Sequence, residues 1–113
     1  MKLTIGTKTF KATLDDNPAT AKLRAMLPLT LDMAELNGNE KHARLPRSLP
    51  VNAVRPVTIR SGDVLLYGND TLVVFYETFR SSYSYTRIGH ITESAMLARA
   101  LGPGNPRVAF TLP

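Results

Sequence analysis

The chain contains no cysteine, no tryptophan and no long hydrophobic run. The absence of cysteine excludes disulfides, thiolate metal ligands and a cysteine nucleophile. No apolar stretch approaches the roughly 20 residues that a membrane-spanning helix needs. Residues 1–6 also lack the apolar segment of a secretory leader, because a turn residue follows at Gly6. These absences predict a cytoplasmic protein without a membrane-embedded part.

Histidine is also scarce, and its placement does not suggest a metal site. His42 and His90 lie far apart in the sequence, whereas a metal centre normally needs three or four ligands with recognisable spacing. The pair Gly102 and Gly104 precedes a strand-like segment rather than a helix, which is the wrong context for a phosphate-binding loop. We therefore expect no metal and no cofactor, and no motif identifies a catalytic residue.

Basic residues are in excess, with a formal net charge of +5. Arginines and lysines are spread over the whole chain, and no run of five or six of them marks a nucleic-acid-binding segment. We interpret them as solvated surface charges and do not expect a nucleic-acid partner. The length of 113 residues and the hydrophobic fraction of 43% suit one core, so a single domain over residues 1–113 is expected.

Short alternating segments separated by turn residues dominate the sequence and predict a mainly β fold. Helices are expected at residues 18–26, capped by Asn17, and at residues 92–101, capped by Thr92. The proline-containing segment 46–56 is expected to be a long loop. About eight strands and two short helices suit a closed β-barrel whose ends the helices cover. The strands are expected at residues 2–5, 9–14, 29–33, 41–45, 63–67, 71–76, 83–91 and 107–112.

Residues 71–91 hold most of the chain's phenylalanine and tyrosine side chains. They predict two strands joined by a short polar turn at residues 80–82. In the second strand Tyr83, Tyr85 and Arg87 fall on one face. That face forms either the wall of a ligand pocket, since a phenol can both stack and hydrogen-bond, or the ordinary outer surface of a barrel.

Two further tyrosines, Tyr67 and Tyr76, are candidates for the same pocket wall because they too combine an apolar ring with a polar tip. Phe75 and Phe79 are expected in the core. The adjacent charges of Glu40 and Lys41 are interpreted as an ion pair that anchors a turn.

The order of several short motifs resembles the small prokaryotic cyclophilin-like proteins, over nearly the whole chain. The motifs are Asp16-Asn17-Pro18, Leu27-Pro28-Leu29-Thr30-Leu31, Asn37-Gly38-x-Glu40-Lys41, Leu45-Pro46, Gly62-Asp63, Tyr67, Phe75-Tyr76-x-x-Phe79 and Arg87-Ile88-Gly89-x-Ile91. The resemblance implies a closed eight-stranded cyclophilin-like β-barrel with two short capping helices. It implies no activity, because the resembled group has none assigned.

The chain departs from true cyclophilins at the positions on which prolyl isomerisation depends. It lacks their Phe-His-Arg run, and Gly62-Asp63 is all that resembles their Gln-Gly-Gly-Asp segment. An isomerase needs an arginine that donates to the proline amide and lowers a barrier of about 18–20 kcal/mol. Arg44 or Arg87 could serve as that arginine, although no motif selects either one.

Three hypotheses of function follow. The first is a non-catalytic module that binds a small organic molecule or a peptide in a groove on the side of the barrel, with Tyr67, Tyr76, Tyr83, Tyr85, Arg87 and Arg44 as the candidate ligand-binding residues. The second is a divergent peptidyl-prolyl cis–trans isomerase. The third is an uncharacterised enzyme or subunit that acts within a homo-oligomer, which would expose a large apolar patch.

Overall fold

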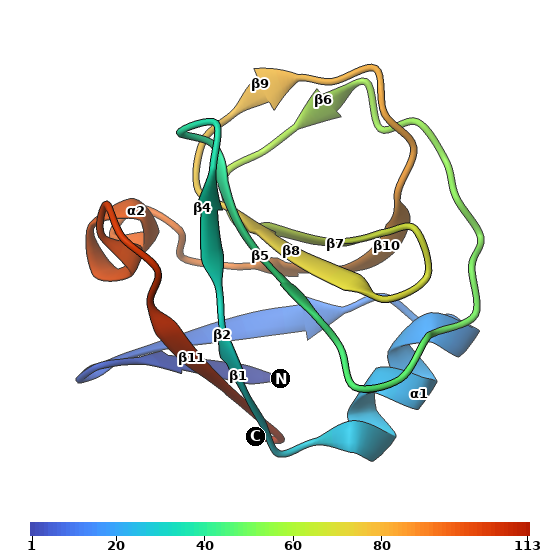
Figure 1. Ribbon diagram of the computed structural model, residues 1–113, viewed down its shortest axis with the longest axis horizontal. Helices are drawn as coiled ribbons and strands as arrows, with labels where there is room; N and C mark the ends of the chain where they lie inside the picture. Colours follow the sequence, from blue (N-terminus) through green and yellow to red (C-terminus); the bar gives the residue numbers. More distant parts are fainter.

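A computed structural model describes residues 1–113 and shows a mainly β protein with two short helices (Figure 1). Most of the strands lie in one large sheet, and two very short strands pair separately. The elements in chain order are β1 (Lys2–Ile5), β2 (Lys8–Leu14), α1 (Pro18–Met26), β3 (Leu29–Asp32), β4 (Ala34–Leu36), β5 (Glu40–Arg44), β6 (Thr58–Ile59), β7 (Asp63–Tyr67), β8 (Thr71–Phe75), β9 (Phe79–Arg80), β10 (Thr86–Ile91), α2 (Leu97–Leu101) and β11 (Arg107–Thr111).

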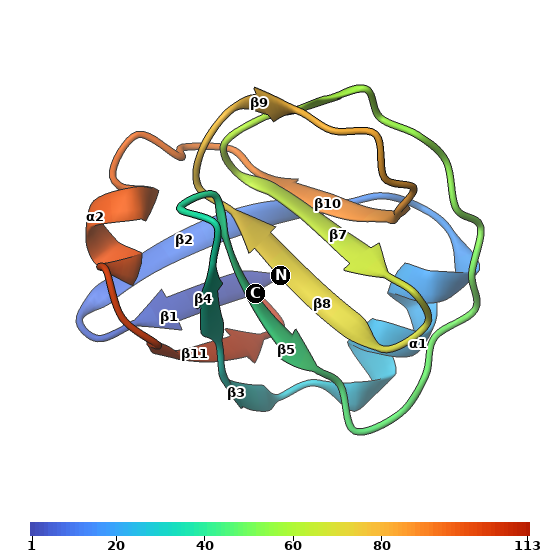
Figure 2. The same ribbon diagram turned by 45° about the horizontal axis from the view of Figure 1, so that its top comes forward.

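The large sheet curls into a nearly closed antiparallel barrel with the strand order β3-β11-β1-β2-β10-β7-β8-β5-β4. Its two outermost strands, β3 and β4, are consecutive in sequence and are separated only by Met33. The backbone N–H of Met33 still donates to the carbonyl of Pro106 before β11, while the next residue, Ala34, pairs with His42 of β5. The predicted barrel is confirmed. The sheet has nine strands, but β3 and β4 together form one bent strand, so the barrel is equivalent to an eight-stranded one (Figure 2).

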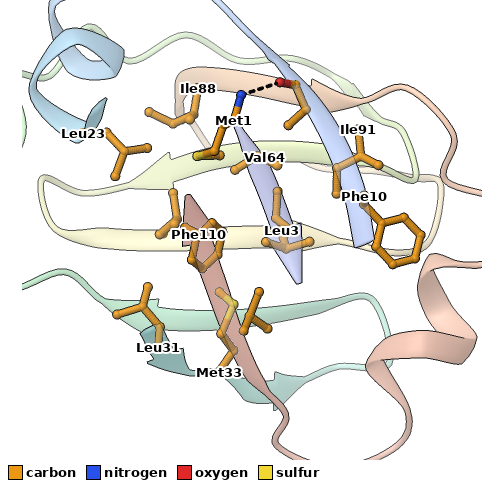
Figure 3. Packing of buried hydrophobic residues seen from close by; sticks show 14 of the residues in the cluster. Met1, Leu3, Phe10, Leu23, Leu31, Met33, Val64, Ile88, Ile91 and Phe110 are labelled. Atoms are coloured by element: carbon orange, nitrogen blue, oxygen red, sulfur yellow. Dashed lines mark hydrogen bonds between the residues drawn. The ribbon is translucent and has the colours of Figure 1, made fainter. Parts of the chain in front are cut away.

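The barrel interior holds the main hydrophobic core, built from alternate residues of every long strand. Leu3 of β1, Val64 of β7 and Phe110 of β11 are completely buried and point toward one another (Figure 3). The same view shows the Met1 amino group donating to the Ala12 carbonyl at 3.2 Å, which holds the first residue against β2. On β10 a bulge between Arg87 and Gly89 shifts the alternation, so that both Ile88 and Ile91 face the core.

Helix α1 begins as predicted. The Asn17 side chain accepts a bond from the Thr20 N–H at 2.9 Å, and the Thr20 hydroxyl accepts from the Asn17 N–H, which forms a capping box. Helix α2 is shorter than predicted and begins at Leu97 rather than after Thr92. The Thr92 N–H donates to the Lys11 carbonyl instead, so this residue continues the pairing of β10 with β2 and does not cap a helix. Neither helix is long and apolar enough to cross a bilayer.

A second, smaller hydrophobic cluster lies on the outer face of β7 and β8. Leu65, Val73 and Phe75 point away from the barrel interior and pack with Ile59 and Tyr85. The short sheet of β6 and β9 contributes Ile59 to this cluster and packs Phe79 against it, and its ribbon lies beside β7 and β8 in Figures 1 and 2. The sequence had suggested one strand up to Phe79 followed by a tight turn. The structure differs, because β8 ends at Phe75 and the chain then crosses the outer face before β10 pairs with β7 and β2.

The predicted loop at residues 46–56 is confirmed and runs along the outside of the barrel (Figure 1). It contacts the crossing segment through mutual backbone bonds between Val54 and Tyr85, both 2.9 Å long. At its end Val57 has a φ of 67°, a left-handed conformation that is costly for a β-branched residue. Its carbonyl accepts a bond from the Ser81 N–H at 2.8 Å, so the strained turn helps to hold the crossing segment in place.

Candidate functional site

A cavity of about 530 Å³ lies outside the barrel, between the outer face of β5 and β8 and the crossing segment around β9. Figures 1 and 2 show the turn between β4 and β5 beside β9, and this turn forms one end of the cavity. The lining residues are Leu36, Asn37, Asn39, Glu40, His42, Tyr67, Thr71, Val73, Phe79, Arg80, Ser81, Ser82, Tyr83 and Tyr85.

Three tyrosines form the aromatic wall of this cavity. The Tyr67 ring lies 6.1 Å from the Tyr83 ring in an edge-to-face arrangement and 5.9 Å from the Tyr85 ring. Tyr67 and Tyr83 are 50% and 61% exposed, whereas Tyr85 is buried and packs edge-to-face on Phe75. The wall therefore has a fixed base and an open rim, which suits a flat or apolar ligand.

Strand β5 supplies the polar side of the cavity through the alternation of its side chains. Glu40 and His42 face outward into the cavity, next to Phe75 and Val73 of β8 in the sheet register. Lys41, between them, faces the barrel interior and is completely buried. The expected Glu40–Lys41 ion pair is therefore wrong, because the two side chains point to opposite faces of the strand.

Two ionisable groups of the cavity, Glu40 and Tyr85, are partly desolvated. Burial raises the pKa of Glu40, and the negative charge of nearby Glu35 raises it further. Burial also raises the pKa of Tyr85; a hydrogen bond with Ser81 opposes this effect, and the Glu40 carboxylate adds to it. The charge of Glu40 thus acts on Tyr85 across the cavity.

Arg44 and Arg87, the two arginines predicted from the sequence to bind a ligand, lie outside the cavity, and each forms an ion pair with a carboxylate. The Arg87 Nε donates to Asp15 at 2.8 Å, and this pair ties β10 to the loop before α1. The Arg44 guanidinium bonds to Asp70 at 3.0 Å, next to the turn between β7 and β8. Of the six candidate residues, the structure brings Tyr67, Tyr83 and Tyr85 together at one cavity and leaves Arg44 and Arg87 elsewhere.

Tyr76, the remaining candidate, belongs to a hydrogen-bonded network on the barrel side of β5. Its hydroxyl donates to Glu35 Oε1 at 2.5 Å, and the Lys41 Nζ lies 3.0 Å from the same oxygen. The Lys41 ammonium also donates to the carbonyls of Gly102 and Gly104 at 2.8 and 2.6 Å. This network joins β4, β5 and the loop before β11, so the contacts of Tyr76 are structural.

A histidine–carboxylate pair is present away from the cavity, where His90 Nδ1 lies 2.8 Å from Asp63 Oδ1. The two residues are cross-strand neighbours on β10 and β7. The second oxygen of Asp63 accepts a bond from the Arg60 N–H, which closes the turn before β7. Neither residue lines the large cavity, and the pair acts as a tie between strands.

Sequence reasoning did not identify Glu40, His42, Phe79 or Arg80 as cavity residues. Side chains alternate along a strand, so the sequence Glu40-Lys41-His42 could have shown that Glu40 and Lys41 point to opposite faces of the sheet. It does not show which face lies beneath another segment of the chain. The covering segment is a non-local feature, since β9 pairs with β6 from a distant part of the chain.

The nearly closed antiparallel barrel, the two short helices and the cavity on the outer wall define a small β-barrel protein with a cavity outside its barrel. Residues 3–112 match the model of the cyclophilin-like family, and the chain therefore belongs to this family. Comparison with curated proteins and with solved structures gives no match.

Proposed function

We propose that this protein is a binding module that holds a small organic molecule, free or as part of a peptide, in the cavity between β5, β8 and the crossing segment. The observation that supports this proposal best is the aromatic wall of Tyr67, Tyr83 and Tyr85 opposite the polar side chains of β5 and the β4–β5 turn. A volume of about 530 Å³ lies within the usual range of about 300–1,000 Å³ for ligand pockets.

The exposure of the aromatic residues supports the same function. An exposed tyrosine ring offers an apolar surface at little cost in conformational entropy, because it has only two side-chain torsions. Tyr83 is 61% exposed although it lies beside two other tyrosines, so a stacked ligand would cover a ring that the chain itself leaves open.

The test is a screen of small aromatic and heterocyclic compounds by NMR, with the ring signals of the four tyrosines as the reporters. Binding in the cavity should shift the signals of Tyr67, Tyr83 and Tyr85 and leave that of Tyr76 unchanged. Tyr83→Ala should weaken a bound compound by about 1 kcal/mol, close to fivefold in Kd, because one stacking surface is lost.

Leu112→Ala serves as the matched control, since Leu112 is an apolar side chain of similar exposure, 50%, outside the cavity. It should leave the affinity unchanged. The proposal is refuted if no compound shifts the three cavity tyrosines at millimolar concentration, or if both variants weaken binding equally.

The alternative, a divergent prolyl isomerase, has less support. Both arginines considered for catalysis are held by carboxylates outside the cavity. NMR exchange measurements on an Ala-Pro peptide test it directly, because the uncatalysed interconversion takes tens to hundreds of seconds. We expect no acceleration by the protein; strong acceleration that Arg87→Ala or Arg44→Ala abolishes would favour the isomerase instead.

A further inference from the structure

Glu40 is the one charged side chain of the cavity that is deeply buried, with 8% of its surface exposed, and it makes no hydrogen bond or ion pair. Its backbone is satisfied by pairing with Phe75 on one side and Leu36 on the other. The carboxylate oxygens keep some exposure toward the cavity, because they are not among the fully buried polar atoms that lack a partner, while burial of the side chain raises the pKa of the group. A carboxylate that lines the cavity and meets no donor of the chain is open to a ligand.

No cation of the chain neutralises Glu40. The adjacent Lys41 faces the barrel interior, where Glu35 and two carbonyls already occupy it. Arg80 and His42 also line the cavity, but Arg80 is exposed at the rim and neither side chain bonds to Glu40. The charge that adds to the raised pKa of Glu40 is that of another carboxylate, Glu35. No cationic side chain of the protein therefore complements this carboxylate.

We propose that the cavity accepts an organic cation, with an ammonium group beside Glu40 and an apolar body against the three tyrosines. This inference rests on the proposed function, since it names the chemical class of the ligand for the same cavity. The group recognised is an alkylammonium, which either a free amine or the lysine side chain of a peptide can supply.

The aromatic wall favours the same class of ligand. The face of a tyrosine ring attracts a cation, and this attraction increases where water is excluded. Tyr67 is inclined to both Tyr83 and Tyr85, with interplanar angles of 88° and 59°, so the three rings point in different directions around the cavity. A charge-assisted bond from an ammonium to the carboxylate is stronger than a neutral hydrogen bond. An anionic ligand of the same shape would instead meet the buried charge of Glu40.

The experiment compares three probes of similar size and different charge: benzylamine, benzyl alcohol and benzoate. Their dissociation constants are measured at neutral pH by NMR titration of the tyrosine ring signals. Benzylamine should bind at least about tenfold more tightly than benzyl alcohol, and benzoate should bind more weakly than the alcohol. A capped Gly-Lys-Gly peptide compared with capped Gly-Gln-Gly distinguishes a lysine side chain from a free amine as the source of the cation.

Glu40→Gln should remove the preference for benzylamine and make it bind like benzyl alcohol. Glu77→Gln is the matched control, because it changes the net charge equally on an exposed residue that does not line the cavity. It should retain the tenfold preference. Circular dichroism of both variants checks that the barrel is intact.

Two outcomes would overturn the inference in different ways. If benzylamine and benzyl alcohol shift the cavity tyrosines with equal affinity and Glu40→Gln changes neither, the cavity binds ligands but does not select cations. If none of the three probes, neither peptide and no compound of the wider screen shifts Tyr67, Tyr83 or Tyr85, the binding function of the cavity fails and the cation preference fails with it.

Discussion

Replacing Lys41 by methionine tests whether the buried ammonium holds β4, β5 and the loop before β11 together. Lys41 is completely buried and bonds to Glu35, Gly102 and Gly104. Methionine has a similar length, so the substitution removes the charge without leaving a large void. It leaves the Glu35 carboxylate without its cation and two carbonyl groups without their donor.

Breaking a buried ion pair from one side typically costs about 3–5 kcal/mol. The Glu35 side chain is 27% exposed and keeps its bonds from Tyr76 and Gly38, so the lower end of this range applies. We therefore expect the free energy of unfolding to fall by about 3 kcal/mol. For a chain of 113 residues this corresponds to a fall in Tm of roughly 10–15 °C.

The assay is urea unfolding followed by circular dichroism, with thermal unfolding as a second measurement. Lys22→Met is the control, because Lys22 is an exposed lysine on α1 and lysine and methionine have similar helix propensities. It should change the stability by less than about 0.5 kcal/mol. A loss below about 1 kcal/mol for Lys41→Met would show that the network contributes little and would refute the reasoning.

Three further predictions concern Tyr76, Glu40 and Val57. Burial and the bond to Glu35 raise the pKa of Tyr76 from 10.0 to about 12, so its stabilising contribution is complete below pH 10 and is lost as the pH rises toward about 12. An ultraviolet titration should show Tyr76 ionising only near pH 12, and ionisation of Tyr76 near pH 10 would contradict this. Because burial raises the pKa of Glu40, its ionised form is less favourable in the folded than in the unfolded state, and Glu40→Gln should raise the urea midpoint at pH 7. This gain should disappear as the pH falls through the carboxyl pKa, and a lower midpoint at pH 7 would contradict it. Val57→Gly should relieve the strain of the left-handed backbone at this residue, roughly 1–3 kcal/mol, while the larger conformational entropy of glycine in the unfolded chain offsets less than about 1 kcal/mol of it. Urea unfolding should therefore show the free energy of unfolding rising by about 1 kcal/mol. A destabilised variant would show that the turn is not strained.

Local patterns predicted the barrel and most of its strands, because alternation and turn residues act over a few neighbouring positions. The capping of α1 by Asn17 was predictable for the same reason. Thr92 also had the features of a cap, but its backbone extends the pairing of β10 with β2 through a bond to the Lys11 carbonyl, and the helix begins only at Leu97; a single sequence does not reveal this pairing.

The candidate site was only partly predictable, because it depends on contacts between distant segments. The tyrosines were recognisable by their residue type, and Tyr67, Tyr83 and Tyr85 do lie together. Arg87 shared an expected face with Tyr83 and Tyr85, yet these tyrosines precede β10 and Arg87 turns toward Asp15. Glu40 was taken for part of an ion pair, since sequence alone does not show that the crossing segment covers the outer face of β5.

The bent strand formed by β3 and β4 has a consequence for aggregation. Unpaired strand edges invite pairing with other molecules, and here one continuous segment occupies both edges of the large sheet. Its weaker half is β4, which has three residues, so transient detachment of β4 would first uncover β5. The residues of β5 are Glu40-Lys41-His42-Ala43-Arg44, and charged residues on an exposed edge discourage intermolecular pairing. The same strand that supplies the carboxylate of the cavity therefore protects the barrel when it opens.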